Sequence, residues 1–206
     1  MKGTFITFEG AEGSGKSTQA QLVHEYLKRR KKPVLFVYEP GAVKISEAIR
    51  RILLDTKNVR MSKECETLLY MAARAQLVKE VIAPALKKGK IVLCDRFLDS
   101  TIAYQGYGYG VFPTFIKQLG RFVTEGIQPD KTFLFDIEVK KGLSRKGQGK
   151  DRIELRSVAY HERVRRGYLK LARQEPNRIE VIKVNQSKEK IFQMVRRSID
   201  RLLYIS

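Results

Sequence analysis

The feature that most constrains this chain is a glycine-rich loop near its N-terminus, GAEGSGKS at residues 10–17. Residues 4–8, before the loop, are apolar and β-branched, which predicts a buried strand. Residues 18–30, after it, carry apolar side chains at helical spacing. Strand, glycine-rich turn and helix in this order are the setting of a phosphate-binding loop, so we expect a nucleoside triphosphate site here.

The residue types in this loop suit phosphate. Glycines allow several backbone N–H groups to converge on one anion, and the following helix adds the positive end of its dipole. Lys16 supplies charge for the outer phosphates, and the Ser17 hydroxyl is a potential ligand for Mg²⁺. The predicted ATP-binding residues are Gly10, Ala11, Glu12, Gly13, Ser14, Gly15, Lys16, Ser17 and Thr18.

Apolar segments alternate with helical patterns along the rest of the chain. The predicted strands are residues 4–8, 33–38, 90–95, 132–137 and 179–184. The predicted helices are residues 18–30, 45–54, 62–88 (with a bend or break at Pro84), 114–124, 153–174 and 188–203. This alternation predicts one α/β domain over residues 1–206, a P-loop NTPase-type three-layer α/β/α fold with a five-stranded parallel sheet.

Two segments lack such a pattern. Residues 96–110 are aromatic and glycine-rich, and we expect a loop there. Residues 140–152 are basic and contain three glycines, with little to fix them in a core, so we expect a lid at about 140–152.

Composition narrows the functional classes. The chain has 206 residues, 43% of them hydrophobic, and no apolar run of about 18 residues, which favours a globular cytoplasmic protein without a membrane partner. Cys65 and Cys94 are expected to be buried free thiols. The net charge of +19 is compatible with nucleic-acid binding or with a phosphate-handling enzyme. Because the basic residues are scattered and no nucleic-acid-binding motif occurs, we expect no specific nucleic-acid partner.

A second chemical site follows the strand at residues 90–95. Asp95 ends this strand and is suited to hold Mg²⁺ or its water, while Arg96 is suited to contact phosphate with two N–H groups. In parallel sheets, ligands bind outside the carboxyl ends of the strands. The P-loop, Glu39, Asp95 and Arg96 should therefore face one cleft.

The block DRFLDSTIAYQG at residues 95–106, together with FEG at 8–10, EPG at 39–41 and YMAAR at 70–74, resembles thymidylate kinase in its bacterial form. The resemblance runs from about residue 3 to residue 173 and keeps the order and spacing of the motifs. It implies MgATP as donor, dTMP as acceptor, products ADP and dTDP, a role in dTTP synthesis, and a homodimer whose interface the residues alone do not identify.

The resemblance also implies residue roles. Tyr70 matches the ring that stacks on thymine, Arg74 matches the arginine that reads the base edge, and Tyr104 matches the residue set against the deoxyribose. The implied dTMP-binding residues are Glu12, Glu39, Arg50, Tyr70, Arg74, Arg96, Thr101, Tyr104 and Gln105. The implied catalytic residues are Lys16, Asp95, Arg96 and two lid arginines, Arg145 first and Arg152 second, and the metal ligands are Ser17 and Asp95.

The sequence departs from the family pattern at two places. Tyr38 stands where the family commonly has arginine, and Tyr70 stands where it usually has phenylalanine. The P-loop contains no arginine between its first glycine and Lys16, so we place the missing charge in the stretch 145–156, at Arg145, Lys146, Lys150, Arg152 or Arg156.

The reaction that is implied needs no general base. A phosphomonoester has a second pKa of about 6, so the acceptor is largely a dianion at neutral pH. Catalysis is then positioning and charge neutralisation. Two alternatives stay open at this point, another nucleoside monophosphate kinase and a nucleic-acid-associated P-loop ATPase.

Overall fold

The computed structural model of the chain describes residues 3–145 and 151–204. Its strands form one sheet in the order β2-β3-β1-β4-β5, and all neighbouring strands are parallel. The strands are β1 (Thr4–Gly10), β2 (Val34–Tyr38), β3 (Ile91–Asp95), β4 (Lys131–Asp136) and β5 (Ile179–Lys183). The predicted five-stranded parallel sheet is confirmed, with every strand at its expected place.

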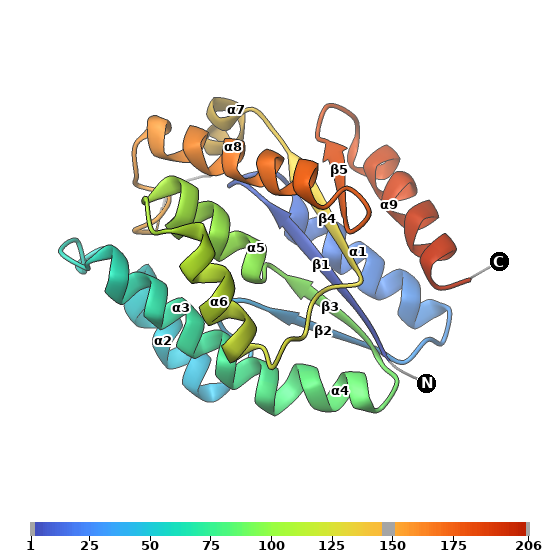
Figure 1. The fold of residues 1–206 in the computed structure, drawn as a ribbon. Helices are drawn as coiled ribbons and strands as arrows, with labels where there is room; N and C mark the ends of the chain where they lie inside the picture. Colours follow the sequence, from blue (N-terminus) through green and yellow to red (C-terminus); the bar gives the residue numbers. More distant parts are fainter. Residues whose placement is uncertain (1–2, 146–150, 205–206) are drawn as a thin grey trace.

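Helices cover both faces of this sheet, which gives the predicted three layers (Figure 1). One face carries α1 (Lys16–Arg29) and α9 (Lys188–Leu202). The other face carries α3 (Lys63–Leu77), the π-helical η1 (Val78–Ile82), α4 (Ala83–Lys87), α5 (Leu98–Thr101), the π-helical η2 (Ile102–Gly108), α6 (Pro113–Val123) and α8 (Val158–Gln174). Helix α2 (Lys44–Leu54) packs against α3, and α7 (Val139–Ser144) follows β4.

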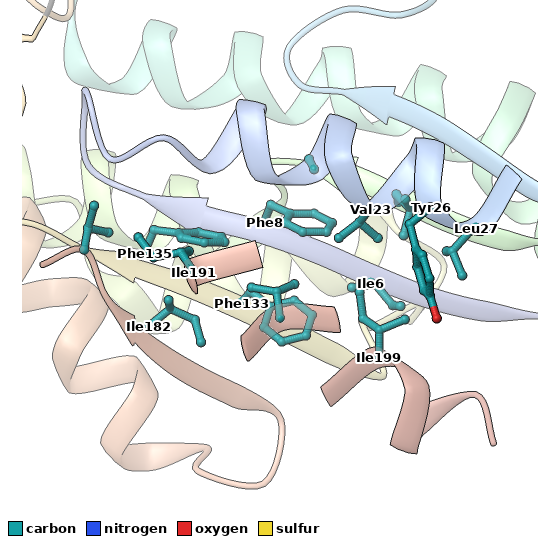
Figure 2. Close-up of a cluster of buried hydrophobic side chains, with 14 of the residues drawn as sticks. Ile6, Phe8, Val23, Tyr26, Leu27, Phe133, Phe135, Ile182, Ile191 and Ile199 are labelled. Carbon is teal, nitrogen blue, oxygen red and sulfur yellow. The ribbon is translucent and has the colours of Figure 1, made fainter. Parts of the chain in front are cut away.

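The core explains why β1 is the central strand. Its side chains alternate between the faces: Ile6 and Phe8 pack with α1 and α9, whereas Phe5 packs on the opposite side against Phe97. Figure 2 shows Phe8 beside Phe133 and Phe135 of β4, all under the cover of α1 and α9. Apolar burial on both faces is typical of a parallel sheet.

The sheet register aligns the strand ends that carry polar residues. Phe8 of β1 lies opposite Asp95 of β3, and Tyr38 of β2 also lies opposite Asp95. The glycine-rich loop after β1 and the polar ends of β2 and β3 therefore meet at one edge of the sheet.

The segment 96–110, expected as a loop, is helical instead and forms α5 and η2. The helix is stabilised by α8, because Gly108 lies against the ring of Tyr160, and Gly167 of α8 lies against the ring of Tyr107. A Cβ at either glycine would come within 3 Å of the facing ring. Tertiary packing thus overrides the turn-forming composition of this segment.

The predicted lid also differs from expectation. Its first half is ordered as α7, whose Val139 is buried. The backbone of Gly142 touches the P-loop so closely that a Cβ there would collide with the carbonyl oxygen of Glu12. The next helix, α8, begins at Val158 rather than near 153, because Ser157 caps it by accepting from the N–H of Tyr160.

The long helix predicted over 62–88 continues through Pro84 as three pieces, α3, η1 and α4. The π-helical η1 ends two residues before Pro84, which stands in the first turn of α4, where the missing N–H of proline is tolerated.

The two cysteines are free, as expected, but only Cys94 is buried, while Cys65 lies exposed on α3. Throughout residues 3–145 and 151–204, the structure contains no helix that is both long enough and apolar enough to cross a membrane.

Candidate functional site

A pocket of about 350 Å³ opens at the carboxyl ends of β1, β2 and β3. It contains residues from both of the sites that the sequence predicts, the P-loop and the DRFLDSTIAYQG block. The predicted site residues that line it are Glu12, Lys16, Ser17, Glu39, Arg50, Tyr70, Arg74, Asp95, Arg96, Thr101, Tyr104 and Gln105. The cleft expected from the sheet topology therefore exists, and it joins the two sites.

The P-loop has the backbone conformation that its glycines allow. Gly15 adopts a φ of 80° immediately before α1, a left-handed conformation that favours glycine. Lys16 then opens the helix and is largely buried. Within the described part of the chain, the buried hydroxyl of Ser14 has no hydrogen-bond partner, so its hydrogen-bonding capacity is not used by the protein. Anions bind well at such a helix N-terminus.

The predicted metal ligands lie in the same pocket. Ser17 and Asp95 both line it, and the buried Oδ1 of Asp95 has no hydrogen-bond partner among residues 3–145 and 151–204. A hydroxyl and a free carboxylate oxygen are ligands that suit Mg²⁺. The described residues include no group of three or more His, Cys, Asp or Glu side chains that could hold a metal, so phosphate oxygens and water would complete the coordination.

Arg96 lies at the centre of the pocket and links its two halves. Its φ of 71° is unusual for a residue with a side chain and marks a backbone held by its surroundings. Its Nη2 donates to Glu12 Oε1 at 2.8 Å and to the Tyr104 hydroxyl at 3.2 Å. The Tyr104 hydroxyl also donates to the same Glu12 oxygen at 2.7 Å. The predicted sugar-side residues, Glu12 and Tyr104, are therefore in contact.

Sequence reasoning missed the residues behind Arg96. The fully buried carboxylate of Glu9 accepts from the Phe97 N–H at 2.7 Å, the Ser100 hydroxyl at 2.6 Å and the Tyr168 hydroxyl at 2.9 Å. Nη1 of Arg96 donates to the Ser100 hydroxyl at 3.1 Å and to the Tyr168 hydroxyl at 3.3 Å. Glu9 and Ser100 stand within the FEG and DRFLDSTIAYQG blocks, whereas no sequence signal marks Tyr168.

Burial raises the pKa of Glu9 to about 7, and the nearby carboxylate of Asp99 adds to the shift, although Ser100 and Arg96 oppose it. Glu9 therefore changes its charge near neutral pH, directly behind the arginine of the pocket.

The far end of the pocket is built around Arg74, which is almost completely buried on α3. Its Nε donates to Glu39 Oε2 at 2.8 Å, and its Nη2 donates to the Thr101 hydroxyl at 3.0 Å. Among the residues that the structure describes, its Nη1 has only a weak acceptor, the sulfur of Met71 at 3.4 Å. Burial raises the pKa of Glu39, while the ion pair with Arg74 opposes that shift. This arrangement leaves one guanidinium nitrogen for a ligand.

Tyr70 and Gln105 line the same end of the pocket, and Arg50 lies at its rim. Nη1 of Arg50 donates to the Pro40 carbonyl at 2.8 Å, and its guanidinium lies 5.6 Å from the centre of the Tyr38 ring. The Tyr38 hydroxyl donates to Glu47 at 2.6 Å. The unusual tyrosine thus holds Arg50 rather than supplying a charge of its own.

The two candidate lid arginines occupy different places. Arg145 is exposed, and its Nη1 donates to the Gly13 carbonyl of the P-loop at 3.3 Å. Arg152 is buried and pairs with Glu66 of α3, with its Nη2 2.6 Å from Glu66 Oε2. Of the other basic residues named for this stretch, Arg156 also pairs with Glu66, with its Nη2 2.6 Å from Glu66 Oε2, whereas Lys146 and Lys150 lie outside the described residues.

Comparison with known proteins agrees with this geometry. The model of the family described as thymidylate kinase matches residues 8–195. The thymidylate kinase of Kosmotoga olearia is 48% identical over 93% of this chain and 92% of its own length. That of Herpetosiphon aurantiacus is 45% identical over 91% of each chain. The crystal structure of thymidylate kinase from Ehrlichia chaffeensis superposes with a TM-score of 0.80 at 34% identity, covering 97% of this chain and 99% of that one. On its sequence, its fold and the contents of its pocket, the chain belongs to the thymidylate kinase family.

Proposed function

We propose that this chain, as a thymidylate kinase, transfers the γ-phosphoryl group of ATP to the phosphate of dTMP within the single pocket described above. The observation that carries the proposal is that the P-loop, Arg96 and the Tyr70–Arg74 end line one continuous cavity. A donor phosphate at Lys16 and an acceptor phosphate at Arg96 then face each other, which is the positioning that phosphoryl transfer needs.

The base and sugar of dTMP occupy the end of the pocket away from the P-loop. Tyr70 stacks on the pyrimidine ring, Nη1 of Arg74 exchanges its weak bond to Met71 for one to a base carbonyl, and Thr101 and Gln105 contact the base edge. Tyr104 and Glu12 face the sugar. Glu39 and Arg50 act on dTMP indirectly. Glu39 holds Arg74 in place, and Arg50 closes the rim of the pocket.

Mg²⁺ bound with ATP would supply charge neutralisation at the β- and γ-phosphates, and Ser17 and Asp95 are the residues that would hold it. Lys16 and Arg96 stabilise the charge that develops on the transferring group. Arg145, next to the Gly13 carbonyl, is the lid arginine best placed to add to that charge. Arg152 contributes through Glu66 instead.

The test is a panel of nucleoside monophosphates with MgATP, scored by ADP release. We expect dTMP to be the best acceptor and dUMP to be weaker, because loss of the thymine methyl removes apolar contact worth about 1–3 kcal/mol. AMP and GMP should be nearly inert. Robust turnover of either purine nucleotide would show that the base end has been assigned wrongly and would favour another nucleoside monophosphate kinase.

A homodimer is part of the proposal. Neighbouring helices carry exposed large apolar side chains, spaced seven residues apart on α2 and on α6. These side chains are Ile45 and Ile52 of α2, Leu68 of α3, and Phe115 and Phe122 of α6. Sedimentation equilibrium should give twice the mass of the chain, and Phe122→Arg should shift it towards the monomer; a monomer in the unaltered protein contradicts the dimer.

We also propose a cytoplasmic location, which the two free thiols support. Fractionation of cells that express the protein tests it.

A further inference from the structure

Glu66 is a completely buried carboxylate that lies one helical turn before Tyr70 on α3. Its Oε2 lies 2.6 Å from Nη2 of Arg152 and 2.6 Å from Nη2 of Arg156. Its Oε1 accepts from Nε2 of Gln105 at 2.9 Å. Glu66 therefore joins two arginines on one side to a pocket-lining amide on the other.

Both arginines are themselves held in place. The guanidinium of Arg156 lies 4.0 Å from the centre of the Tyr109 ring and 4.6 Å from that of Tyr160, a cation–π contact with each of two roughly perpendicular rings. Nε of Arg152 donates to the Leu53 carbonyl at 2.9 Å. The carboxylate between them consequently has little freedom to turn.

The contact with Glu66 decides which way round the Gln105 amide lies. A carboxamide has one donor end and one acceptor end, which differ only by a half-turn of the terminal bond. Nη2 of Arg156 donates to Oε2 of Glu66, and the guanidinium of Arg152 forms an ion pair with the same oxygen. Because the Glu66 carboxylate is thereby held as an acceptor, the nitrogen of Gln105 must face it. The oxygen, Oε1, is then the amide atom that remains for a ligand in the pocket.

We propose that Glu66 is a positioning residue for acceptor specificity, which fixes the Gln105 carboxamide so that the pocket presents an acceptor to the pyrimidine ring. Thymine and uracil carry a donor, N3–H, at the ring edge, whereas cytosine carries a lone pair at N3. An oxygen from Gln105 bonds the first and faces the second with no hydrogen between them. A buried acceptor that is left opposite another acceptor is costly. This inference rests on the proposed placement of the base next to Gln105.

The test is Glu66→Gln, with kcat/KM measured for dTMP, dUMP and dCMP. An amide at position 66 can donate or accept, so Gln105 becomes free to turn over and present either end. We expect the dTMP-to-dCMP ratio of kcat/KM to fall by about tenfold or more. The dTMP-to-dUMP ratio should stay within about twofold of the original value, because both bases carry N3–H. Generally weakened packing would change both ratios.

Thr67→Val is the matched control. Thr67 is the next residue on α3 and is equally buried, and its hydroxyl donates to the Lys63 carbonyl within its own helix. Both ratios should be unchanged in it. An unchanged dTMP-to-dCMP ratio in Glu66→Gln, or an equal fall in Thr67→Val, overturns the proposal.

Removing the charge of Glu66 takes the carboxylate partner from the buried Arg152 and the partly buried Arg156, which can prevent folding. The double variant Glu66→Gln/Arg156→Met keeps the net charge of the group formed by Glu66, Arg152 and Arg156. Its dTMP-to-dCMP ratio of kcat/KM is compared with that of Arg156→Met alone. A lower ratio in the double variant supports the proposal, and an equal ratio overturns it.

Gln105→Leu separates this inference from the proposed function. If Gln105→Leu leaves the dTMP-to-dCMP ratio unchanged, the base does not lie at Gln105 and the proposed placement fails. If it lowers the ratio while Glu66→Gln does not, the placement stands and only the role of Glu66 fails.

Discussion

Lys16 is the residue whose role in the P-loop is most direct, because it opens α1 and lines the pocket that also contains Arg96. Lys16→Ala should lower kcat by about 10²-fold or more, since the lysine acts on charge that develops during transfer. Steady-state kinetics with dTMP and MgATP measure this. Lys28→Ala, which removes an exposed lysine from the same helix, should leave kcat unchanged.

Arg96 differs from Lys16 in being tied to Glu12 and Tyr104 in the protein itself. Arg96→Ala should therefore lower kcat by about 10²-fold and also lower the melting temperature, because Glu12 loses the partner of a largely buried ion pair. Arg96→Lys restores charge without the paired N–H geometry, and we expect it to recover melting temperature more than kcat. Near-normal kcat in Arg96→Ala would remove this residue from the catalytic group.

Glu9 should give stability an unusual dependence on pH. Its pKa is raised in the fold to about 7, so between its ordinary value of 4.5 and 7 the folded protein binds a proton that the unfolded chain has released. The free energy of unfolding contributed by this group is thus highest below about pH 4.5 and falls as the pH rises to 7. Urea denaturation at pH 5, 6 and 7 should show the decline in the wild-type protein, and Glu9→Gln should lack that part of it. Parallel pH profiles for the two proteins would contradict the raised pKa.

At the scale of elements, the lid arginines can be separated because one follows α7 and the other precedes α8. Arg145, beside the Gly13 carbonyl, should act on the reacting complex, so Arg145→Ala should lower kcat more than it raises the KM for dTMP. Arg152→Ala breaks the pair with Glu66 and should instead lower the melting temperature by several degrees. Kinetics and thermal denaturation of the two single variants and the double variant decide this; unchanged kcat in all three would show that neither arginine serves transfer.

The elements also show what the sequence can and cannot predict. The five strands follow from apolar runs, and the P-loop follows from its glycines, because both depend on local chemistry. Helices α5, η2 and α7 were not predictable in the same way, since Gly108 and Gly142 are placed there by contact with Tyr160 and with the P-loop, far away in the sequence. In the sequence alone, glycine indicates a turn. Only the residue that packs against it in the fold shows that the segment is helical.

The same distinction holds within the site. Lys16, Arg74 and Arg96 belong to recognisable motifs, and all three line the pocket. Glu66 and Tyr168 belong to no motif that a single sequence reveals, because they act by hydrogen bonds to other side chains and touch the pocket only through them.

At the scale of the whole molecule, the net charge of +19 remains the property that the pocket does not explain. We expect weak DNA binding that is independent of sequence and declines steeply with salt, as release of counterions requires. Fluorescence anisotropy with a labelled duplex measures this affinity. The salt concentration should be varied from about 50 to about 200 mM, the range over which phosphate contacts are largely lost. Tight binding at physiological salt, or ATP hydrolysis stimulated by DNA, would revive the nucleic-acid-associated ATPase.

The contact between Gly13 and Gly142 joins the P-loop to α7 through backbone alone, so no side chain can be added at either position without moving the other segment. We therefore expect substitutions at Gly13 and Gly142 to be tolerated only together. Among relatives, we expect a residue larger than glycine at one of them to occur together with a change in the length of the chain between β4 and α8. A change in the length of the lid should therefore be accompanied by a change in the sequence of the P-loop.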